Sequence, residues 1–466
     1  MHRLVASCAG DLPAVTAALR ALPAGVDAAE VRFDRLWQAV PNEDEAERTI
    51  EAVLGAAKVP LVATLRPRSH GGGFGGTEAE RVNLLAALAR LGFEPDLESH
   101  LLEVPGLAGQ VRDGTLAVAS HHHAGEAPCR DDGLRRLLQL QDAGTGLEKL
   151  AFTSSSFADH LRALELARAH AERGGKPCLS PMGSGGALLR ALLPLAGNQA
   201  TYGHAPGLPP AVPGQPGADE LLAIWRHWGL DPKEATGGRW LAVLGTPVAH
   251  SLSPRMMNAA LRAAGRPERF GALEVPASAG ALRLLLHVAD RIGLAGASVT
   301  MPHKAEALRM VQADALAKEV GAVNCITFGP TGATGTNTDA PALVEVLRPH
   351  AGGTALVLGA GGAARAAVWA LRQLGAKAQV ASRSQDGIAT LAWARRHEAA
   401  ADVVVNATPL AAPLDRLPPG AAYVDLAYGH GLSADGRRAL LEQGVLAYRS
   451  WFGAAPDQAA MERALA

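Results

Sequence analysis

Short apolar runs alternate with amphipathic stretches through the first half of the chain. "AAEVRFDRL" and "VPLVATLRP" contain the apolar runs expected of strands, whereas "AERVNLLAALARLG" has the spacing of a helix. The alternation continues through strand-like "LAVASHH", "LEKLAFTS" and "KPCLSPMG", with helical stretches between them. Strands that alternate with helices in this way form parallel βαβ units. About 220 residues of the pattern favour a closed (β/α)8 barrel of the TIM type over an open sheet.

The pattern is interrupted by a Pro/Gly-rich stretch at 205–217 and by the polar segment "DPKEATGGR". A new alternation begins with "WLAVLG", and the apolar strand "TALVLG" marks a further boundary. A chain of 466 residues is long enough for several domains. We predict a barrel over 1–230, a linker over 231–239, a substrate-binding α/β domain over 240–345, a Rossmann domain over 346–445, and a C-terminal helix over 446–466 that packs back on the substrate domain.

Composition excludes several classes of function. A net charge of -1 gives no bulk basic field for nucleic acid or an anionic membrane, and no window has the apolar length of a membrane span. The first residues contain too short an apolar stretch for a signal peptide. The four cysteines are far apart, which argues against a disulfide framework or zinc cluster and favours the reducing cytoplasm. Only seven of the 44 basic residues are lysine, so a lysine among apolar residues is noteworthy, because arginine cannot act as an amine nucleophile.

A glycine pattern in "LVLGAGGAARAA" follows an apolar strand and opens a helix. This context predicts a dinucleotide whose pyrophosphate lies at the helix N-terminus. The next strand, "KAQVAS", is followed by Arg383 instead of ending in the acid that reads the NAD ribose, so NADP is favoured. The expected cofactor contacts are Gly359, Ala360, Gly361, Gly362, Ala363, Ser382, Arg383, Asn406 and Thr408.

Four further clusters precede this turn: "GTPVAHSLSP", "GASVTMPHK", "GAVNC" and "GTNTDA". In order and approximate spacing they resemble the motifs of shikimate dehydrogenase over about 239–466. The resemblance implies a small anionic polyol substrate, with Lys304 and Asp339 as the catalytic pair. It also implies substrate contacts from Ser251, Ser253, Thr300, Asn324, Asp339, Tyr428 and Gln443. Ser298 and Cys325 depart from the family's Asn and Thr.

In "GLEKLAF", strand alternation places Lys149 on one face with Leu147 and Ala151. An amine that projects inward among apolar side chains would have a lowered pKa, as an imine-forming lysine requires. A lysine at a strand end that reaches solvent agrees equally well with the strand alone.

"EKLAF", together with "EVRFD", "ATLRP", "SHHHAG" and "PGQ", resembles type I 3-dehydroquinate dehydratase over about 1–230. That family has a (β/α)8 barrel in which a lysine forms an imine with the substrate ketone. The resemblance implies that Lys149 forms the imine and that His122 is the catalytic base. The implied substrate contacts are Glu30, Arg32, Arg66, Arg190 and Gln215. Three positions depart from the family pattern, namely His70 for a glutamate that orients the base, and Leu189 and Ala211 for serines.

Three consecutive histidines, His121 to His123, raise the alternative of a metal site. Neighbours on a strand point to opposite faces, so only His121 and His123 can share a side. No cysteine or carboxylate ligand set lies nearby in the sequence, so we expect no metal.

Together the two resemblances predict a fusion that dehydrates 3-dehydroquinate to 3-dehydroshikimate and reduces this product to shikimate with NADPH. The expected partners are these small molecules alone, with no nucleic acid or membrane, in a monomer or homodimer. Three alternatives remain at this point. They are a shikimate dehydrogenase with a non-catalytic barrel, a ligand sensor without turnover, and a quinate/shikimate oxidoreductase that uses NAD.

Overall fold

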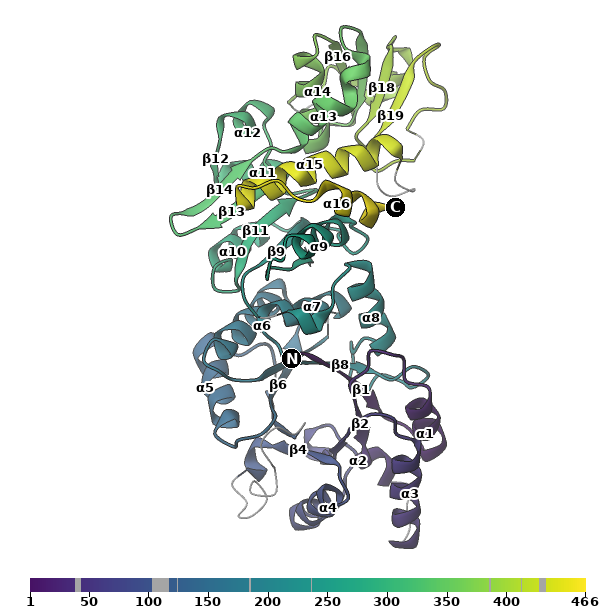
Figure 1. Cartoon of the computed structure of the whole chain (residues 1–466), viewed down its shortest axis with the longest axis vertical. Coiled ribbons are helices and arrows are strands. Elements are labelled where there is room, and N and C mark those ends of the chain that lie inside the picture. Colours follow the sequence, from purple (N-terminus) through teal and green to yellow (C-terminus); the bar gives the residue numbers. More distant parts are fainter. Residues whose placement is uncertain are drawn as a thin grey trace. The chain divides into compact units, whose positions relative to one another are not determined.

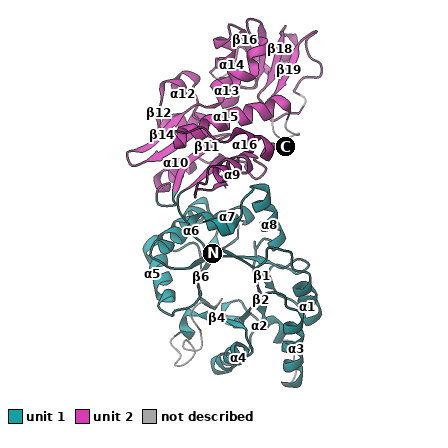
Figure 2. Ribbon diagram, viewed as in Figure 1, with its two compact units in different colours: residues 1–239, 291–293 teal, residues 240–290, 294–466 magenta. Residues whose placement is uncertain are grey.

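The computed structural model describes residues 1–37, 43–102, 117–123, 125–183, 186–235, 237–384, 387–411, 413–426 and 433–466. The chain forms two compact units, drawn in teal and magenta in Figure 2. The first unit comprises residues 1–239 with 291–293, and the second comprises 240–290 with 294–466.

The first unit is built on an eight-stranded parallel sheet in the order β7-β6-β5-β4-β3-β2-β1-β8. Two hydrogen bonds bring its ends together, because Gln199 N–H donates to the Pro177 carbonyl and Leu179 N–H donates to Asn198 Oδ1, both at 2.7 Å. The predicted barrel is therefore confirmed. Its strands are β1 (Arg3–Cys8), β2 (Ala28–Arg32), β3 (Leu61–Thr64), β4 (Glu94–Glu98), β5 (Val118–His122), β6 (Leu147–Ser154), β7 (Pro177–Gly183) and β8 (Ala200–His204).

Helices surround the barrel strands (Figure 1). They are α1 (Leu12–Arg20), α2 (Phe33–Leu36), α3 (Glu43–Ala56), α4 (Glu78–Arg90), α5 (Arg130–Gln141), α6 (Phe157–Ala171), α7 (Gly186–Leu192) and α8 (Ala218–His227). Thr77 and Ser156 begin α4 and α6 with capping boxes, in which the hydroxyl and an acidic side chain satisfy free backbone N–H groups. The barrel interior is filled by Val5, Ala28, Val62, Val118, Leu147, Cys178, Ala200 and Tyr202. These side chains form one packed layer of the interior, as in other barrels of this kind.

The second unit contains two sheets. The first has the order β10-β9-β11-β13-β14-β12 and mixes parallel and antiparallel pairs. Its strands are β9 (Trp240–Gly245), β10 (Phe270–Glu274), β11 (Leu294–Val299), β12 (Gln312–Ala313), β13 (Cys325–Gly329) and β14 (Gly332–Thr336). The accompanying helices are α9 (Ser253–Ala263), α10 (Ala281–Val288), α11 (Lys304–Met310), α12 (Ala315–Val320) and α13 (Asp339–Leu347).

The second sheet is fully parallel, with the order β17-β16-β15-β18-β19. Its strands are β15 (Thr354–Leu358), β16 (Lys377–Ser382), β17 (Leu391–Ala392), β18 (Val403–Asn406) and β19 (Ala422–Asp425), and α14 (Gly362–Gln373) follows β15. The chain leaves β15 for β16 on one side and later returns to β18 on the other. Such a switch in strand order is where open α/β sheets bind nucleotides, so the predicted Rossmann fold is confirmed.

Two helices complete the chain, α15 (Ala434–Phe452) and α16 (Gln458–Leu465). Both pack against α9, and Trp451 Nε1 donates to the Ile326 carbonyl of β13 at 2.9 Å. Among the described residues, no helix combines the length and apolarity that crossing a bilayer requires.

Candidate active sites

The first candidate site is centred on the amine of Lys149, which points into the barrel from β6. Its Nζ lies 3.2 Å from Asp96 Oδ2 and 3.5 Å from Glu30 Oε1. Asp96 comes from β4 and Glu30 from β2, and all three residues are buried. The amine therefore lies between two carboxylates at the barrel interior.

These carboxylates correct the expected protonation of the amine. Burial acts to lower the pKa of Lys149, but the charges of Asp96 and Glu30 outweigh it and raise the pKa. In turn, Lys149 helps lower the pKa of both acids against the effect of their burial. The expectation of a lowered lysine pKa is thus wrong. The free lysine is an ammonium ion, and it must pass a proton to a neighbour before it can attack a carbonyl carbon.

His122 lies at the end of β5, the strand that pairs with β6. Its Nε2 is buried and has no hydrogen-bond partner among the described residues. Burial, Arg66 and Lys149 lower the pKa of His122 well below its usual value. A neutral imidazole with a free ring nitrogen can accept a proton, which is the property of a general base.

A chain of hydrogen bonds holds Glu30 in place. Gln215 Nε2 donates to Ser7 Oγ at 3.0 Å, and Ser7 Oγ donates to Glu30 Oε2 at 2.6 Å. Thr64 Oγ1 donates to the other carboxylate oxygen at 2.8 Å. The backbone N–H of Ala211 donates to Gln215 Oε1 at 2.9 Å, so Gln215 is held without the family's serine hydroxyl.

A second ionic network lies beside the first, around Glu98 of β4. Arg66 is 3.4 Å from Glu98 and 3.6 Å from Asp96, and Arg81 also pairs with Glu98. His70 Nδ1 lies 2.7 Å from Glu98 Oε1. Position 70 itself carries no carboxylate, but its imidazole is bonded directly to the carboxylate of Glu98.

Two further arginines that were predicted to bind the substrate, Arg32 and Arg190, have partners within the protein. Arg32 pairs with Asp34 at 2.8 Å. Arg190, which is 2 % exposed, donates to the carbonyls of Tyr202 and Pro181, both at 2.8 Å. Leu189 beside it is buried and adds no hydrogen-bonding group. The structure thus brings Glu30, Arg66, His122 and Lys149 together, and the charge of Arg32 acts on Glu30 and His122 from its pair with Asp34. Arg190 is instead bonded to backbone carbonyls.

The three consecutive histidines have separate environments. Ser99 Oγ is 3.1 Å from His121 Nδ1, and the His123 backbone N–H donates to the Ala151 carbonyl at 2.8 Å. Within the described ranges, no three His, Cys, Asp or Glu side chains are grouped as a metal would require. His121 and His123 therefore contact groups other than those around His122, which ends β5 beside Lys149.

Asp96 and Glu98 were missed by the sequence reading. The segment "EPDLE" has three acids at alternate positions, and Asp96 and Glu98 share one face towards the carboxyl end of the strand. Acidic residues at this edge of a barrel are a signal for a site, because the active sites of such barrels lie there.

The second candidate site contains Lys304 and Asp339, in the second unit. Lys304 Nζ donates to Asp339 Oδ2 at 2.7 Å, and Asn324 Nδ2 donates to Asp339 Oδ1 at 2.8 Å. Thr338 N–H donates to Asn324 Oδ1 at 2.6 Å. Lys304 begins α11 and Asp339 begins α13, so two helix starts and the chain before β13 meet here. The lysine is held by one oxygen of a carboxylate whose other oxygen is also bonded.

The other predicted substrate contacts lie on nearby elements of this unit. Thr300 donates its N–H to the Leu244 carbonyl at the end of β9, and Ser253 N–H donates to Ser251 Oγ at 3.3 Å. Gln443 is buried in α15, where its Nε2 donates to the Leu440 carbonyl at 2.6 Å. Tyr428 lies outside the described residues.

The two departures from the family motifs face each other. Ser298 of β11 and Cys325 of β13 are partners in the antiparallel ladder, and both are buried. Ser298 Oγ has no hydrogen-bond partner in the part of the chain that the structure describes. A buried hydroxyl of this kind is usually satisfied by water or a ligand.

The glycine turn after β15 has the geometry predicted for a nucleotide site. Gly359 has φ +104°, which favours glycine, and Gly361 precedes α14 with open space where a Cβ would lie. Ser382 ends β16, and Arg383 beside it is exposed. Asn406 Oδ1 accepts from Thr408 Oγ1 at 2.7 Å, which shapes the loop after β18. The residues present fit a dinucleotide with its phosphates over the turn.

The glycine turn also contacts the aliphatic stem of Lys304. A Cβ on Gly362 would lie 2.6 Å from Lys304 Cδ and 2.9 Å from Lys304 Cβ. Position 362 therefore has to be glycine for the lysine stem to pass, and the nucleotide turn and the lysine are in direct contact.

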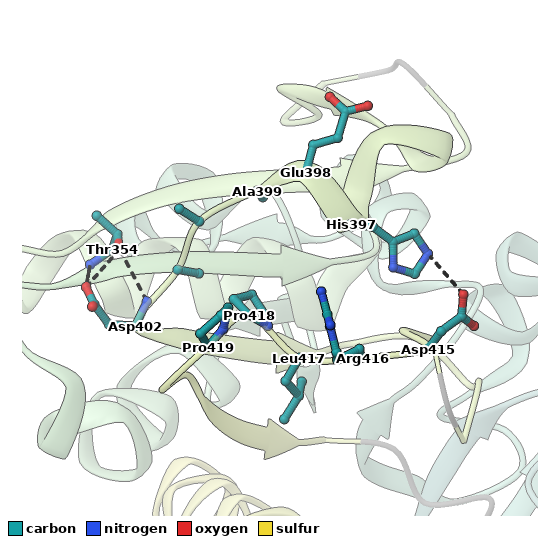
Figure 3. A pocket seen from close by; sticks show the side chains of 12 residues that line it. Thr354, His397, Glu398, Ala399, Asp402, Asp415, Arg416, Leu417, Pro418 and Pro419 are labelled. Atoms are coloured by element: carbon teal, nitrogen blue, oxygen red, sulfur yellow. Dashed lines mark hydrogen bonds and ion pairs between the residues drawn. The ribbon is translucent and has the colours of Figure 1, made fainter.

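A separate pocket of about 500 Å³ is lined by residues next to the strands of the parallel sheet that contains β15 (Figure 3). It is lined by Thr354, which begins β15, and by Asp402, which precedes β18 and accepts from Thr354 Oγ1 at 2.8 Å. His397 and Asp415 line its other end, 3.8 Å apart. The nucleotide turn follows the carboxyl end of β15, whereas this pocket lies at the amino ends of β15 and β18. The two sites are therefore at opposite ends of the strands.

The fold and the two lysine centres define a two-unit α/β protein, with a lysine-bearing barrel and a dinucleotide-binding unit. Family models match three stretches of the chain: Type I 3-dehydroquinase at residues 7–231, the shikimate dehydrogenase substrate binding domain at 243–326, and the shikimate 5'-dehydrogenase C-terminal domain at 436–466. The NADP(+) shikimate dehydrogenase of Acidiphilium cryptum is 37 % identical over 256 residues, covering 47 % of this chain and 92 % of its own length. The chain belongs to the shikimate dehydrogenase family, and its first half is similar to type I 3-dehydroquinase.

Two further proteins are similar to this chain, one over most of its length and the other over its second half. The chloroplastic bifunctional 3-dehydroquinate dehydratase/shikimate dehydrogenase of Arabidopsis thaliana is 28 % identical over 394 residues, which cover 79 % of this chain. The matched region spans 62 % of that relative's length. The shikimate 5-dehydrogenase of Thermus thermophilus, solved with NADP(H) and shikimate, is 35 % identical and covers 49 % of this chain and 98 % of its own, with a TM-score of 0.42.

Proposed function

We propose that the chain is a bifunctional enzyme of the shikimate pathway. Its barrel dehydrates 3-dehydroquinate to 3-dehydroshikimate, and its second unit reduces 3-dehydroshikimate to shikimate with NADPH. The observation that carries the proposal is the presence of two amine–carboxylate centres. The buried centre of Lys149 and Asp96 lies within the region matched by the type I 3-dehydroquinase model. In the second centre, which is only partly exposed, Lys304 lies within the region matched by the shikimate dehydrogenase substrate binding domain and pairs with Asp339.

In the barrel, Lys149 reacts with the substrate ketone. An ammonium ion and a ketone together give a protonated imine and one water, so the positive charge stays on the nitrogen. Asp96 and Glu30 are close enough to take the amine proton and return it to the departing oxygen. His122 then removes a proton from the carbon next to the imine, and the substrate hydroxyl leaves as a second water. Hydrolysis of the imine releases 3-dehydroshikimate and restores the lysine.

In the second unit, Lys304 is the proton donor. Bound over the turn at 359–363, NADPH would supply the hydride that the reduction of the carbonyl requires. Lys304 donates a proton to the carbonyl oxygen as negative charge develops there, and Asp339 holds the ammonium group in position. Ser251, Ser253, Thr300, Asn324 and Gln443 would contact the polyol, with Tyr428 as a further candidate. Cofactor contacts would come from the turn at 359–363 and from Ser382, Arg383, Asn406 and Thr408.

The proposal includes a reducing compartment, the cytoplasm, in which the four free cysteines would stay reduced. It further includes small-molecule partners alone, in a monomer or homodimer. The direct test is an assay that starts from 3-dehydroquinate and NADPH and follows NADPH oxidation and shikimate formation. We expect both from the single chain; oxidation from 3-dehydroshikimate but not from 3-dehydroquinate would limit the proposal to the second unit.

Replacing Gly362 by alanine should slow the reduction about 10- to 100-fold, because the new Cβ would push the Lys304 stem away from its position beside Asp339. The matched control is Gly361→Ala, whose Cβ meets no protein atom but occupies the space over the turn. Steady-state kinetics should show a lower kcat for Gly362→Ala and a higher KM for NADPH for Gly361→Ala. Equal effects on both constants in the two variants would contradict the contact.

Replacing Arg383 by aspartate should raise the KM for NADPH about 10- to 100-fold, the loss expected for one charge-assisted hydrogen bond to the 2′-phosphate. The KM for NADH should not rise, because NADH lacks that phosphate. Initial rates with both cofactors give the answer. An unchanged ratio of the two KM values would show that Arg383 does not select the cofactor.

A further inference from the structure

The ring of Tyr202 lies against the reactive amine of the barrel. Tyr202 projects inward from β8, and Lys149 Nζ is 4.0 Å from the centroid of its ring. The side chain is 3 % exposed, and its hydroxyl has no hydrogen-bond partner among the described residues. The contact of the amine is therefore with the aromatic face, and no hydrogen bond explains why the residue is a tyrosine.

An aromatic face attracts a cation, and the attraction is strongest where water is excluded. The amine has this ring on one side and the carboxylates of Asp96 and Glu30 at 3.2 and 3.5 Å on others. The charged or titratable groups that interact with the amine are Glu30, Arg66, Asp96, His122 and Cys178. The Tyr202 hydroxyl is a further titratable group of the same cluster, since Glu30, Arg66, Asp96 and Cys178 act on it.

We propose that Tyr202 is a positioning residue of the barrel site. The face of its ring stabilises the positive charge on Lys149 Nζ, both in the free ammonium ion and in the protonated imine. This proposal rests on the proposed dehydratase function. Because ammonium and protonated imine carry the same charge on the same atom, one ring serves both states. The ring also holds the Lys149 nitrogen at one position in the barrel. It thereby helps to set the distance between His122 and the carbon next to the imine.

The test distinguishes the effect of the Tyr202 ring from the effect of its hydroxyl. Tyr202→Phe keeps the aromatic face, whereas Tyr202→Leu removes it. With seven lysines in the chain, the ¹³Cε signals of labelled protein can be followed during a pH titration, and Lys149→Met identifies the signal of Lys149. We expect the midpoint of Lys149 to fall by about one pH unit in Tyr202→Leu and to stay within a few tenths of a unit in Tyr202→Phe. Tyr202→Met serves as the ring-free variant if the leucine variant does not fold.

An unchanged midpoint in the ring-free variant, or an equal fall in Tyr202→Phe, would overturn the role of the ring. The titration requires no substrate, so it remains decisive if the dehydratase function fails. Borohydride trapping with 3-dehydroquinate then addresses the reaction. We expect the wild type and Tyr202→Phe to be labelled on Lys149 at similar rates, and Tyr202→Leu about tenfold more slowly, as for a misplaced nucleophile. A wild type that is not labelled would overturn the imine chemistry alone.

Discussion

Lys149→Met should lower the rate of 3-dehydroquinate dehydration by at least about 10³-fold, while the reduction of 3-dehydroshikimate continues at the wild-type rate. Methionine fills a similar volume but has no amine, so the imine cannot form. Two observations make the expectation specific. The amine is the cation between Asp96 and Glu30, and these three residues lie in the first unit, apart from Lys304 and Asp339. Dehydration is measured by the absorbance of the enone product, and the reduction by NADPH oxidation.

Borohydride trapping provides the matched control for this variant. The wild type treated with 3-dehydroquinate should gain the mass of the reduced adduct on Lys149, and Lys149→Met should gain none. His122→Ala should still be trapped, because the base acts after the imine has formed. Full dehydratase activity in Lys149→Met, or absence of the adduct in the wild type, would show that the barrel does not use this lysine. The chain would then be a reductase with a barrel of another role.

Lys304→Met should lower kcat for reduction of 3-dehydroshikimate by about 10²- to 10⁴-fold, the range associated with loss of a positioned general acid. The KM for NADPH should change little, because the stem of Lys304 contacts the turn at Gly362 but leaves the open side of Gly361 free. Dehydration of 3-dehydroquinate should be unchanged, so 3-dehydroshikimate should accumulate in the complete assay. Stopped-flow measurement of NADPH oxidation, together with detection of this intermediate, checks both statements.

Asp339→Asn is the companion variant. It keeps the size of the side chain but removes the charge that holds Lys304 Nζ at 2.7 Å. We expect a smaller loss of kcat than in Lys304→Met, because the lysine can still reach the substrate oxygen. A loss in Asp339→Asn that exceeds the loss in Lys304→Met would assign the proton transfer to the aspartate.

Much of the fold could be predicted from local pattern. "LEKLAFTS" and "KPCLSPMG" correspond to β6 and β7, and the glycine turn lies between β15 and α14 as expected. Short apolar runs of this kind indicate strands that are buried on both faces, as β6 and β7 are over most of their length. The strand predicted from "AAEVRFDRL" was too long, because the observed strand ends at Arg32 and a short helix begins at Phe33. Element boundaries depend on contacts that the pattern does not contain.

The barrel site shows where sequence reasoning stopped. The lysine and the histidine could be singled out by motif, but the acids beside the lysine could not. Asp96 is 53 residues from Lys149 in the chain, and a parallel barrel brings them within 3.2 Å. Tyr202 was likewise missed, because a tyrosine in an apolar strand is usually a core residue. The error in the pKa of Lys149 follows directly from these omissions.

The sequence by itself determined the order of the elements, the two lysines and the glycine turn, because strand and helix periods and short motifs are properties of adjacent residues. Only the tertiary structure decided the charge state of Lys149, the pairing of His70 with Glu98, and the contact between Gly362 and Lys304. The physical reason is that electrostatic energy and steric exclusion depend on distance in space. The folded strands, and not the spacing along the chain, set that distance.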